Sequence, residues 1–136
     1  MKKIFLILFL SLAFSAYSQD AEIQISIAEQ EPFVTVEQMP VYPGGDRAMM
    51  DFISKNIVYP TMARDSSKQG KVRIKFVVGI DGTLRDIKVV GKTRLGFGLE
   101  EAAIAVVEKM PAWQPGKQND KAVPVYFMLP ISFRLL

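Results

Sequence analysis

Few side chains in this sequence could carry out covalent chemistry. The chain contains no cysteine and no histidine, which excludes thiol nucleophiles, histidine-based triads, zinc fingers and haem ligation. Glu100 and Glu101 are an adjacent carboxylate pair, but neighbouring side chains on a helix point in diverging directions. The acidic residues also lack the loop spacing of a carboxylate metal site. The sequence therefore predicts no catalytic residue, no metal site and no cofactor, and a protein that is not an enzyme.

The remaining chemistry is backbone hydrogen bonding by the last fifteen residues, 122–136. Apolar residues occupy every second position of this segment: Val123, Val125, Phe127, Leu129, Ile131, Phe133 and Leu135. Such alternation is typical of a strand with one buried face. Pro124 and Pro130 are both even-numbered, so they remove N–H donors from the same lateral edge. Because proline in a sheet is nearly confined to edge strands or bulges, the segment is predicted to be an edge strand.

An edge strand must be protected from other chains or used to bind one. Between the two prolines, Tyr126 and Met128 keep the N–H donors of the even-numbered edge, which leaves a short window for a bound strand. The predicted partner-binding site is therefore Val125, Tyr126, Phe127, Met128 and Leu129. These residues alone leave open the alternative that the prolines only prevent aggregation.

The N-terminus has the features of a secretory signal peptide. Lys2 and Lys3 precede an apolar run over residues 4–14, which is shorter than the about twenty residues that a membrane-spanning helix needs. We expect cleavage after Ser18, so that the chain consists of a signal peptide (1–18), a polar leader (19–38) and a domain (39–136). The alternative is an uncleaved anchor in the inner membrane.

The charge balance argues against nucleic acid as a partner. Lys2 and Lys3 are two of the 17 basic residues, so removal of residues 1–18 leaves 15 basic against 14 acidic residues and a net charge of +1. A nucleic-acid-binding domain normally carries a strong excess of basic residues. We therefore expect an exported protein that does not bind nucleic acid.

Two segments have the apolar spacing of amphipathic helices. The first follows Asp46, which is the expected N-cap, and ends at Tyr59-Pro60, since proline disfavours the helical conformation in the residue before it. A further short helical turn is expected at residues 62–63. The second helix covers residues 99–110.

Between these helices the sequence predicts a β-hairpin. Residues 72–78 alternate in polarity, Asp81-Gly82 supplies the turn, and residues 84–90 return with a shift in parity that predicts a bulge near Arg85-Asp86. The predicted fold class is α+β: a small antiparallel sheet, made of the hairpin and the C-terminal strand, with two helices packed on one face as a two-layer sandwich.

Several further residues have both a structural and a functional interpretation. Tyr59 and Trp113 are candidate partner contacts, although each also suits a packing role at the border of a helix or loop. Arg73, Lys75 and Lys88 can form a basic stripe on the open face of the sheet, for which a simple solvated surface is the alternative.

Several short motifs resemble, in their order and spacing, the C-terminal domain of TonB proteins. They are Tyr59-Pro60, Gln69-Gly70-Lys71-Val72, Asp81-Gly82-Thr83-Leu84, the helix at 99–107, Trp113-Gln114-Pro115, Val123-Pro124-Val125 and Ser132-Phe133. The upstream segment 39–45 resembles the form common in Bacteroidetes-type members. The resemblance covers residues 39–136.

The resemblance implies a periplasmic module of Gram-negative bacteria. Family members bind the TonB box, a short segment of an outer-membrane TonB-dependent receptor, by adding it as a strand beside their last strand. They serve as energy transducers in transport across the outer membrane. Full transducers also have an uncleaved transmembrane helix, which couples to the ExbB–ExbD motor, and a long proline-rich spacer.

In this sequence the N-terminal segment is expected to be cleaved, and the polar leader is not a long proline-rich spacer. ExbB–ExbD is therefore an expected partner only if the N-terminus stays uncleaved. The alternative function is a homodimerising or cell-wall-associated structural module without a transport role.

Overall fold

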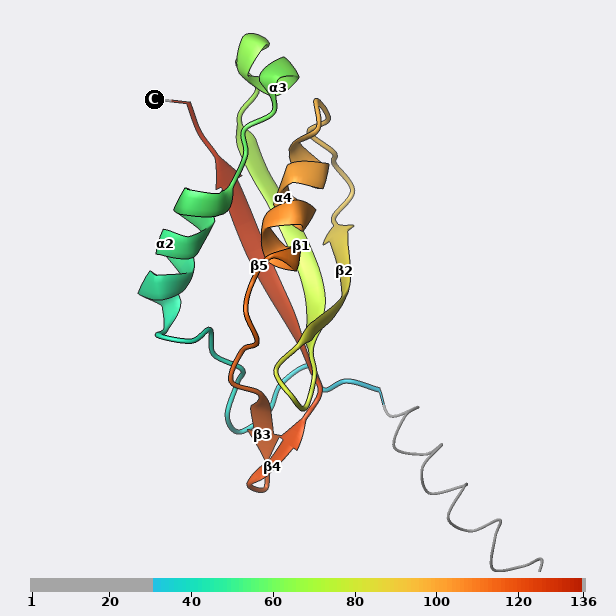
Figure 1. Ribbon diagram of the computed structural model, residues 1–136. Coiled ribbons are helices and arrows are strands. Elements are labelled where there is room, and N and C mark those ends of the chain that lie inside the picture. Colours follow the sequence, from blue (N-terminus) through green and yellow to red (C-terminus); the bar gives the residue numbers. More distant parts are fainter. Residues whose placement is uncertain (1–30, 136) are drawn as a thin grey trace, which may run out of the picture. The chain divides into compact units, whose positions relative to one another are not determined.

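Three antiparallel strands in the order β2–β1–β5 form the main sheet of the protein. The computed structural model describes residues 31–135 (Figure 1), so the predicted signal peptide and most of the predicted leader lie outside the described residues. The strands are β1 (Gly70–Val78), β2 (Leu84–Val90) and β5 (Val125–Phe133). The helices are α2 (Asp46–Asn56), α3 (Thr61–Asp65) and α4 (Leu99–Glu108).

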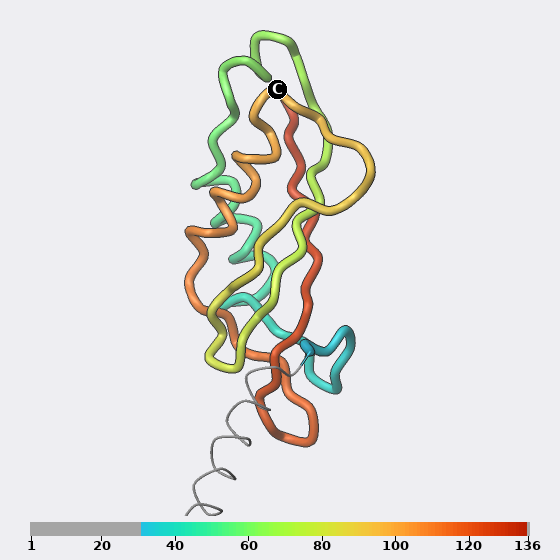
Figure 2. Tube along the Cα trace, turned by 90° about the vertical axis from the view of Figure 1, so that its right-hand side faces the viewer, coloured from blue at the N-terminus to red at the C-terminus, as the bar shows by residue number. Residues whose placement is uncertain are grey.

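The helices α2 and α4 cover the same face of this sheet (Figure 2). Alternate side chains of β1 and β5 point toward them, since the register pairs Val72 with Ile131 and Ile74 with Leu129. The resulting core is apolar, and its buried residues include Met49, Ile53, Val72, Ile74, Phe76, Val78, Leu99, Ala103, Val106, Val107, Leu129, Ile131 and Phe133. The predicted α+β class, with helices packed on one face, is therefore confirmed.

The hairpin between β1 and β2 was predictable from its local residues. Thr83 donates from its backbone N–H and its hydroxyl to Oδ1 of Asp81, at 3.1 Å and 2.7 Å, and these hydrogen bonds lower the pKa of the Asp81 carboxyl. The register shifts where Lys75 pairs with Lys88 but Val77 pairs with Arg85. This shift is the predicted bulge.

The predicted N-cap of α2 is wrong. Gly45 is the N-cap, and Asp46 is the first residue of the helix without a side-chain capping hydrogen bond. Gly45 has a φ of +88°, and its N–H donates to the carbonyl of Tyr42 at 2.8 Å. This tight turn lets the helix begin one residue earlier, and Asp46 then interacts favourably with the helix dipole in the first turn.

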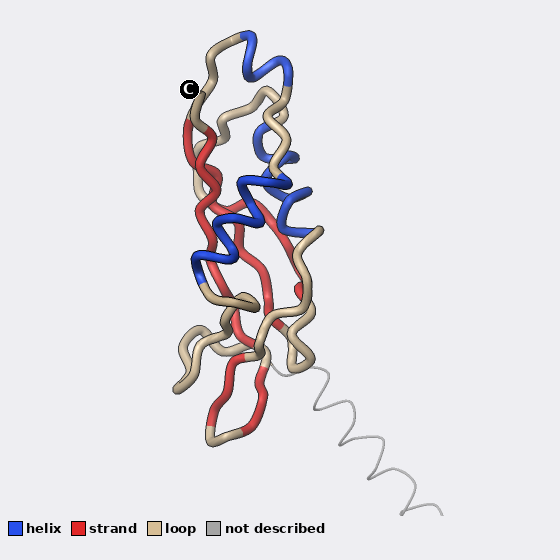
Figure 3. Tube along the Cα trace, turned by 60° about the vertical axis from the view of Figure 1, so that its left-hand side comes forward, coloured by secondary structure: helices blue, strands red, loops and turns tan. Residues whose placement is uncertain are grey.

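The predicted terminal strand is interrupted at Pro124. A separate hairpin precedes β5, formed by β3 (Gly116–Gln118) and β4 (Lys121–Val123), and it extends beyond the end of the main sheet (Figure 3). Asn119 and Asp120 have φ values of +53° and +61°, as a two-residue hairpin turn requires. Residues 116–123 thus form a complete short hairpin.

Gly82 joins the β1–β2 turn to the loop after α4. The N–H of Trp113 donates to the carbonyl of Gly82 at 2.8 Å. Gly82 has a φ of +84°, and a Cβ atom there would lie 1.9 Å from the backbone oxygen of Trp113. Only glycine can occupy this position without moving the loop.

We expect Gly82→Ala to lower the free energy of unfolding by about 3 kcal/mol, because it adds a backbone clash to the strain of a positive φ. Gly96→Ala is the matched control, because Gly96 also has a positive φ (+76°) but open space around it, and should cost only about 1 kcal/mol. Urea unfolding curves of both variants measure the difference. Equal losses would contradict the close approach of the two loops.

Candidate functional site

The outer edge of β5 is the main candidate for binding. β5 is at the border of the sheet, and it pairs with β1 without a register shift from Gly70–Phe133 to Val78–Val125. At its start, the N–H of Tyr126 donates outward to Phe33. Because backbone direction alternates along a strand, the even-numbered residues face outward throughout. The prediction that Pro124 and Pro130 share one edge is therefore confirmed.

Part of this edge is already occupied by the chain itself. Phe33 forms a parallel bridge with Val125: its N–H donates to the carbonyl of Pro124 at 2.9 Å, and its carbonyl accepts from the N–H of Tyr126 at 2.8 Å. We call residues 33–41 the clasp. Its remainder is held by reciprocal backbone hydrogen bonds of Gln38 with Lys117 and of Val41 with Gln114, each at 2.8–3.1 Å.

The clasp changes the set of donors that a partner could use. The N–H of Tyr126, one of the two donors predicted from the sequence, is bonded to Phe33. The outward N–H groups of Met128 and Ser132 find no acceptor within residues 31–135. Ser132 was missed because the predicted window ended at Pro130, although the parity of the strand would have identified it.

The five predicted site residues divide between the two faces of β5. Val125 and Leu129 are buried, and Phe127 is half-buried; their side chains point into the helix-covered layer, and their backbone groups point to β1. Tyr126 is half-buried and Met128 is 54% exposed on the opposite, open face. A strand at the outer edge would therefore meet Tyr126 and Met128 rather than the whole segment.

Trp113 is a packing residue in this structure. It is 3% exposed, and its ring meets those of Tyr42, Phe76 and Phe127 at centroid distances of 5.8, 5.5 and 4.9 Å. Within residues 31–135, its indole Nε1 is buried without a hydrogen-bond partner. These contacts account for its position, and a direct partner contact stays a prediction.

Tyr59 also makes structural contacts. Its hydroxyl donates to the carbonyl of Lys68, and its ring packs edge-on against Phe133 at 5.7 Å. Tyr59 thus ties the segment after α2 to the segment before β1, and its predicted partner contact is likewise untested.

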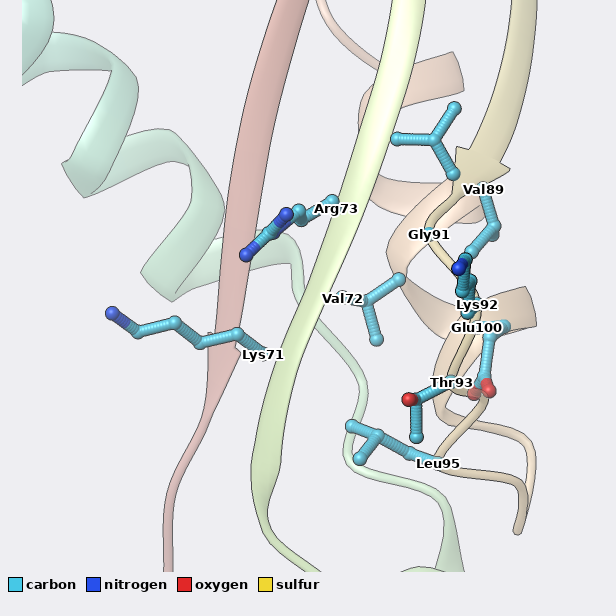
Figure 4. A pocket seen from close by; sticks show the side chains of 10 residues that line it. Lys71, Val72, Arg73, Val89, Gly91, Lys92, Thr93, Leu95 and Glu100 are labelled. Atoms are coloured by element: carbon cyan, nitrogen blue, oxygen red, sulfur yellow. The ribbon is translucent and has the colours of Figure 1, made fainter.

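A hollow of about 230 Å³ lies between β1 and the segment after β2 (Figure 4). Lys71, Arg73, Lys92 and Glu100 are among its lining residues. The Glu100 carboxylate accepts two contacts from the N–H of Gly96, at 3.0 and 3.2 Å, so it is used in ordering the loop. No group of three or more acidic side chains within residues 31–135 is placed to hold a metal ion.

Residues 55–135 match the family model of the Gram-negative bacterial TonB protein C-terminal. The chain belongs to this family. The match runs from the end of α2 through β5 and so includes the whole main sheet. Proteins of this family are interaction modules and energy transducers without catalytic activity, and they face the periplasm.

Two solution structures of the TonB C-terminal domain of Helicobacter pylori are similar to this TonB-family chain. The first is 26% identical to this chain and has a TM-score of 0.48. The matched region covers 69% of this chain and 87% of the Helicobacter pylori chain. The second is 27% identical and has a TM-score of 0.43. The matched region covers 64% of this chain and 89% of the Helicobacter pylori chain. No curated protein matches the chain. Within residues 31–135, no helix has the length and apolar character to cross a bilayer.

The edge of β5 can be tested by amide hydrogen exchange. We expect the N–H of Met128 and Ser132 to exchange rapidly, because they lack acceptors, and those of Tyr126 and Leu129 to be protected by Phe33 and β1 respectively. Residue-resolved exchange by NMR measures this pattern. Protection of Met128 equal to that of Leu129 would mean that another segment or a second chain covers the edge.

Proposed function

We propose that this protein is a periplasmic TonB-like module that binds a short extended segment, the TonB box, of an outer-membrane TonB-dependent receptor. The segment is added as a strand to the outer edge of β5, and binding is linked to energy-dependent transport across the outer membrane. The observation that supports this proposal best is an uncovered stretch of β5 edge, at Met128 and Ser132, in a member of the TonB C-terminal family.

The stretch of the β5 edge that is open to a receptor segment is short, because it is limited at both of its ends. Phe33 occupies the edge at Tyr126, and Pro130 contributes a carbonyl but no N–H donor. The donors of Met128 and Ser132 and the outward carbonyls between them provide the main-chain ladder. Each such hydrogen bond contributes only about 0.5–1.5 kcal/mol, so the complex is weak unless side chains add to it.

Export by the signal peptide brings the protein to the periplasm in this proposal. ExbB–ExbD is a further partner only if the N-terminal segment remains as an inner-membrane anchor. The alternative function is a structural module, homodimerising or associated with the cell wall, in which the same uncovered edge pairs with a second copy. Sedimentation at micromolar concentration, with and without a receptor peptide, distinguishes a dimer from a peptide complex.

We expect Met128→Pro to weaken binding of receptor plug-segment peptides at least about tenfold, because it removes one of the two N–H donors of the open edge. Met128→Ala is the matched control, since it shortens the side chain but keeps the N–H, and its affinity should stay within about twofold of the parent protein. Titration calorimetry against peptides from the plug segments of receptors of the same bacterium measures both affinities.

Thermal unfolding of both variants verifies that β5 remains in the sheet. Undiminished peptide binding by a folded Met128→Pro variant would remove the β5 edge as the binding site. An equal loss of peptide affinity in Met128→Ala and Met128→Pro would mean that the peptide is recognised by the side chain of Met128 instead of by the main chain.

A further inference from the structure

Cationic side chains form a line along the open face of the main sheet. Lys71, Arg73 and Lys75 occupy every second position of β1 and point away from the helix-covered layer, because Val72, Ile74 and Phe76 fill that layer. On β2, Lys88 lies directly opposite Lys75. The register places Arg73, Lys75 and Lys88 on this face, as the sequence predicted, and Lys71 extends the positive stripe.

The described part of the chain does not neutralise this stripe. The ion pair present within residues 31–135 joins Arg85 to Asp86 at 3.0 Å, and Asp86 is the one acidic residue in the strands of the main sheet. The direct opposition of Lys75 and Lys88 is unfavourable for folding. A like-charge arrangement that costs stability and is not offset by an ion pair within residues 32–135 is typical of a binding surface.

The β1 cations are directed toward the candidate binding edge. The Nζ of Lys75 lies 4.2 Å from the centre of the Tyr126 ring, so this charge contacts a side chain of β5. Figure 4 shows the side chains of Lys71 and Arg73 also pointing from β1 toward β5, away from Lys92 and Glu100. Their cross-strand neighbours on β5 are Ser132 and Pro130, whose small side chains leave room for the cations to extend.

A strand added at the outer edge would lie about 4.8 Å beyond β5, with alternate side chains on the open face. Those side chains would be next to Met128, Pro130 and Ser132, which are the cross-strand neighbours on β5 of Lys75, Arg73 and Lys71. We infer that the bound segment carries Asp or Glu at alternate positions, which Lys71, Arg73 and Lys75 recognise, with apolar residues between them facing the helix layer. This inference rests on the proposed function and specifies the chemistry of the partner.

The charge contacts would be solvent-exposed and therefore individually weak. Exposed ion pairs contribute modestly and are screened by salt. Together, three such contacts would distinguish an acidic segment from a neutral one about tenfold at low ionic strength. They would add specificity to a main-chain ladder that by itself accepts almost any extended sequence.

The test uses two octapeptides that alternate Glu with Val or Gln with Val, titrated into the mature protein at low and high salt. We expect the Glu peptide to bind about tenfold more tightly at low salt, and the preference to disappear in the triple variant K71Q/R73Q/K75Q. The matched control is K55Q/R64Q/K109Q, which removes three exposed helix or helix-end cations and so changes the net charge equally. This control should keep the preference.

Each outcome separates the inference from the proposed function. Equal binding of both peptides to the parent protein would overturn the acidic specificity and leave the β5 edge intact. Binding of neither, when a receptor plug peptide does bind, would also overturn it, whereas no binding of any peptide would overturn the proposed function as well. Binding to phosphatidylglycerol vesicles that is lost in K71Q/R73Q/K75Q, without a preference for the Glu peptide, would reassign the stripe to a membrane surface.

Discussion

The antiparallel ladder between β1 and β5 is the interaction on which the rest of the structure depends. It joins nine residues of each strand in continuous register. Because side chains alternate along a strand, a slip of one residue would exchange the two faces of β5. The register therefore decides that Ile74 and Leu129 enter the core while Lys75 and Met128 remain on the open face.

The same ladder determines which backbone groups can meet another chain. β1 is central and bonded on both sides, so only the strands at the border retain unpaired edges. On β5, Pro124, Pro130 and the bridge to Phe33 reduce the open edge to a short stretch. A short, interrupted edge can accept one partner segment while it resists pairing with long strands of other molecules.

Local patterns were sufficient for most of the fold. The two long helices, the β-hairpin, its bulge and the apolar face of β5 follow from periodicity, turn residues and proline positions over short distances. Asp46 was wrongly predicted as the N-cap because the spacing of apolar residues gives no information on the positive φ of the preceding Gly45. The β3–β4 hairpin was missed because its three-residue strands are too short to show alternation.

The sequence by itself determined the absence of cysteine and histidine chemistry, the parity that places both prolines on one edge, and the basic stripe of β1. Only the tertiary structure decided that Phe33 covers the N–H of Tyr126 and that Lys75 contacts the Tyr126 ring. The physical reason is that periodicity acts between neighbours in the chain. Pairing between residues as distant as Phe33 and Val125 depends on the completed sheet, whose edge exists only after β1 and β5 have met.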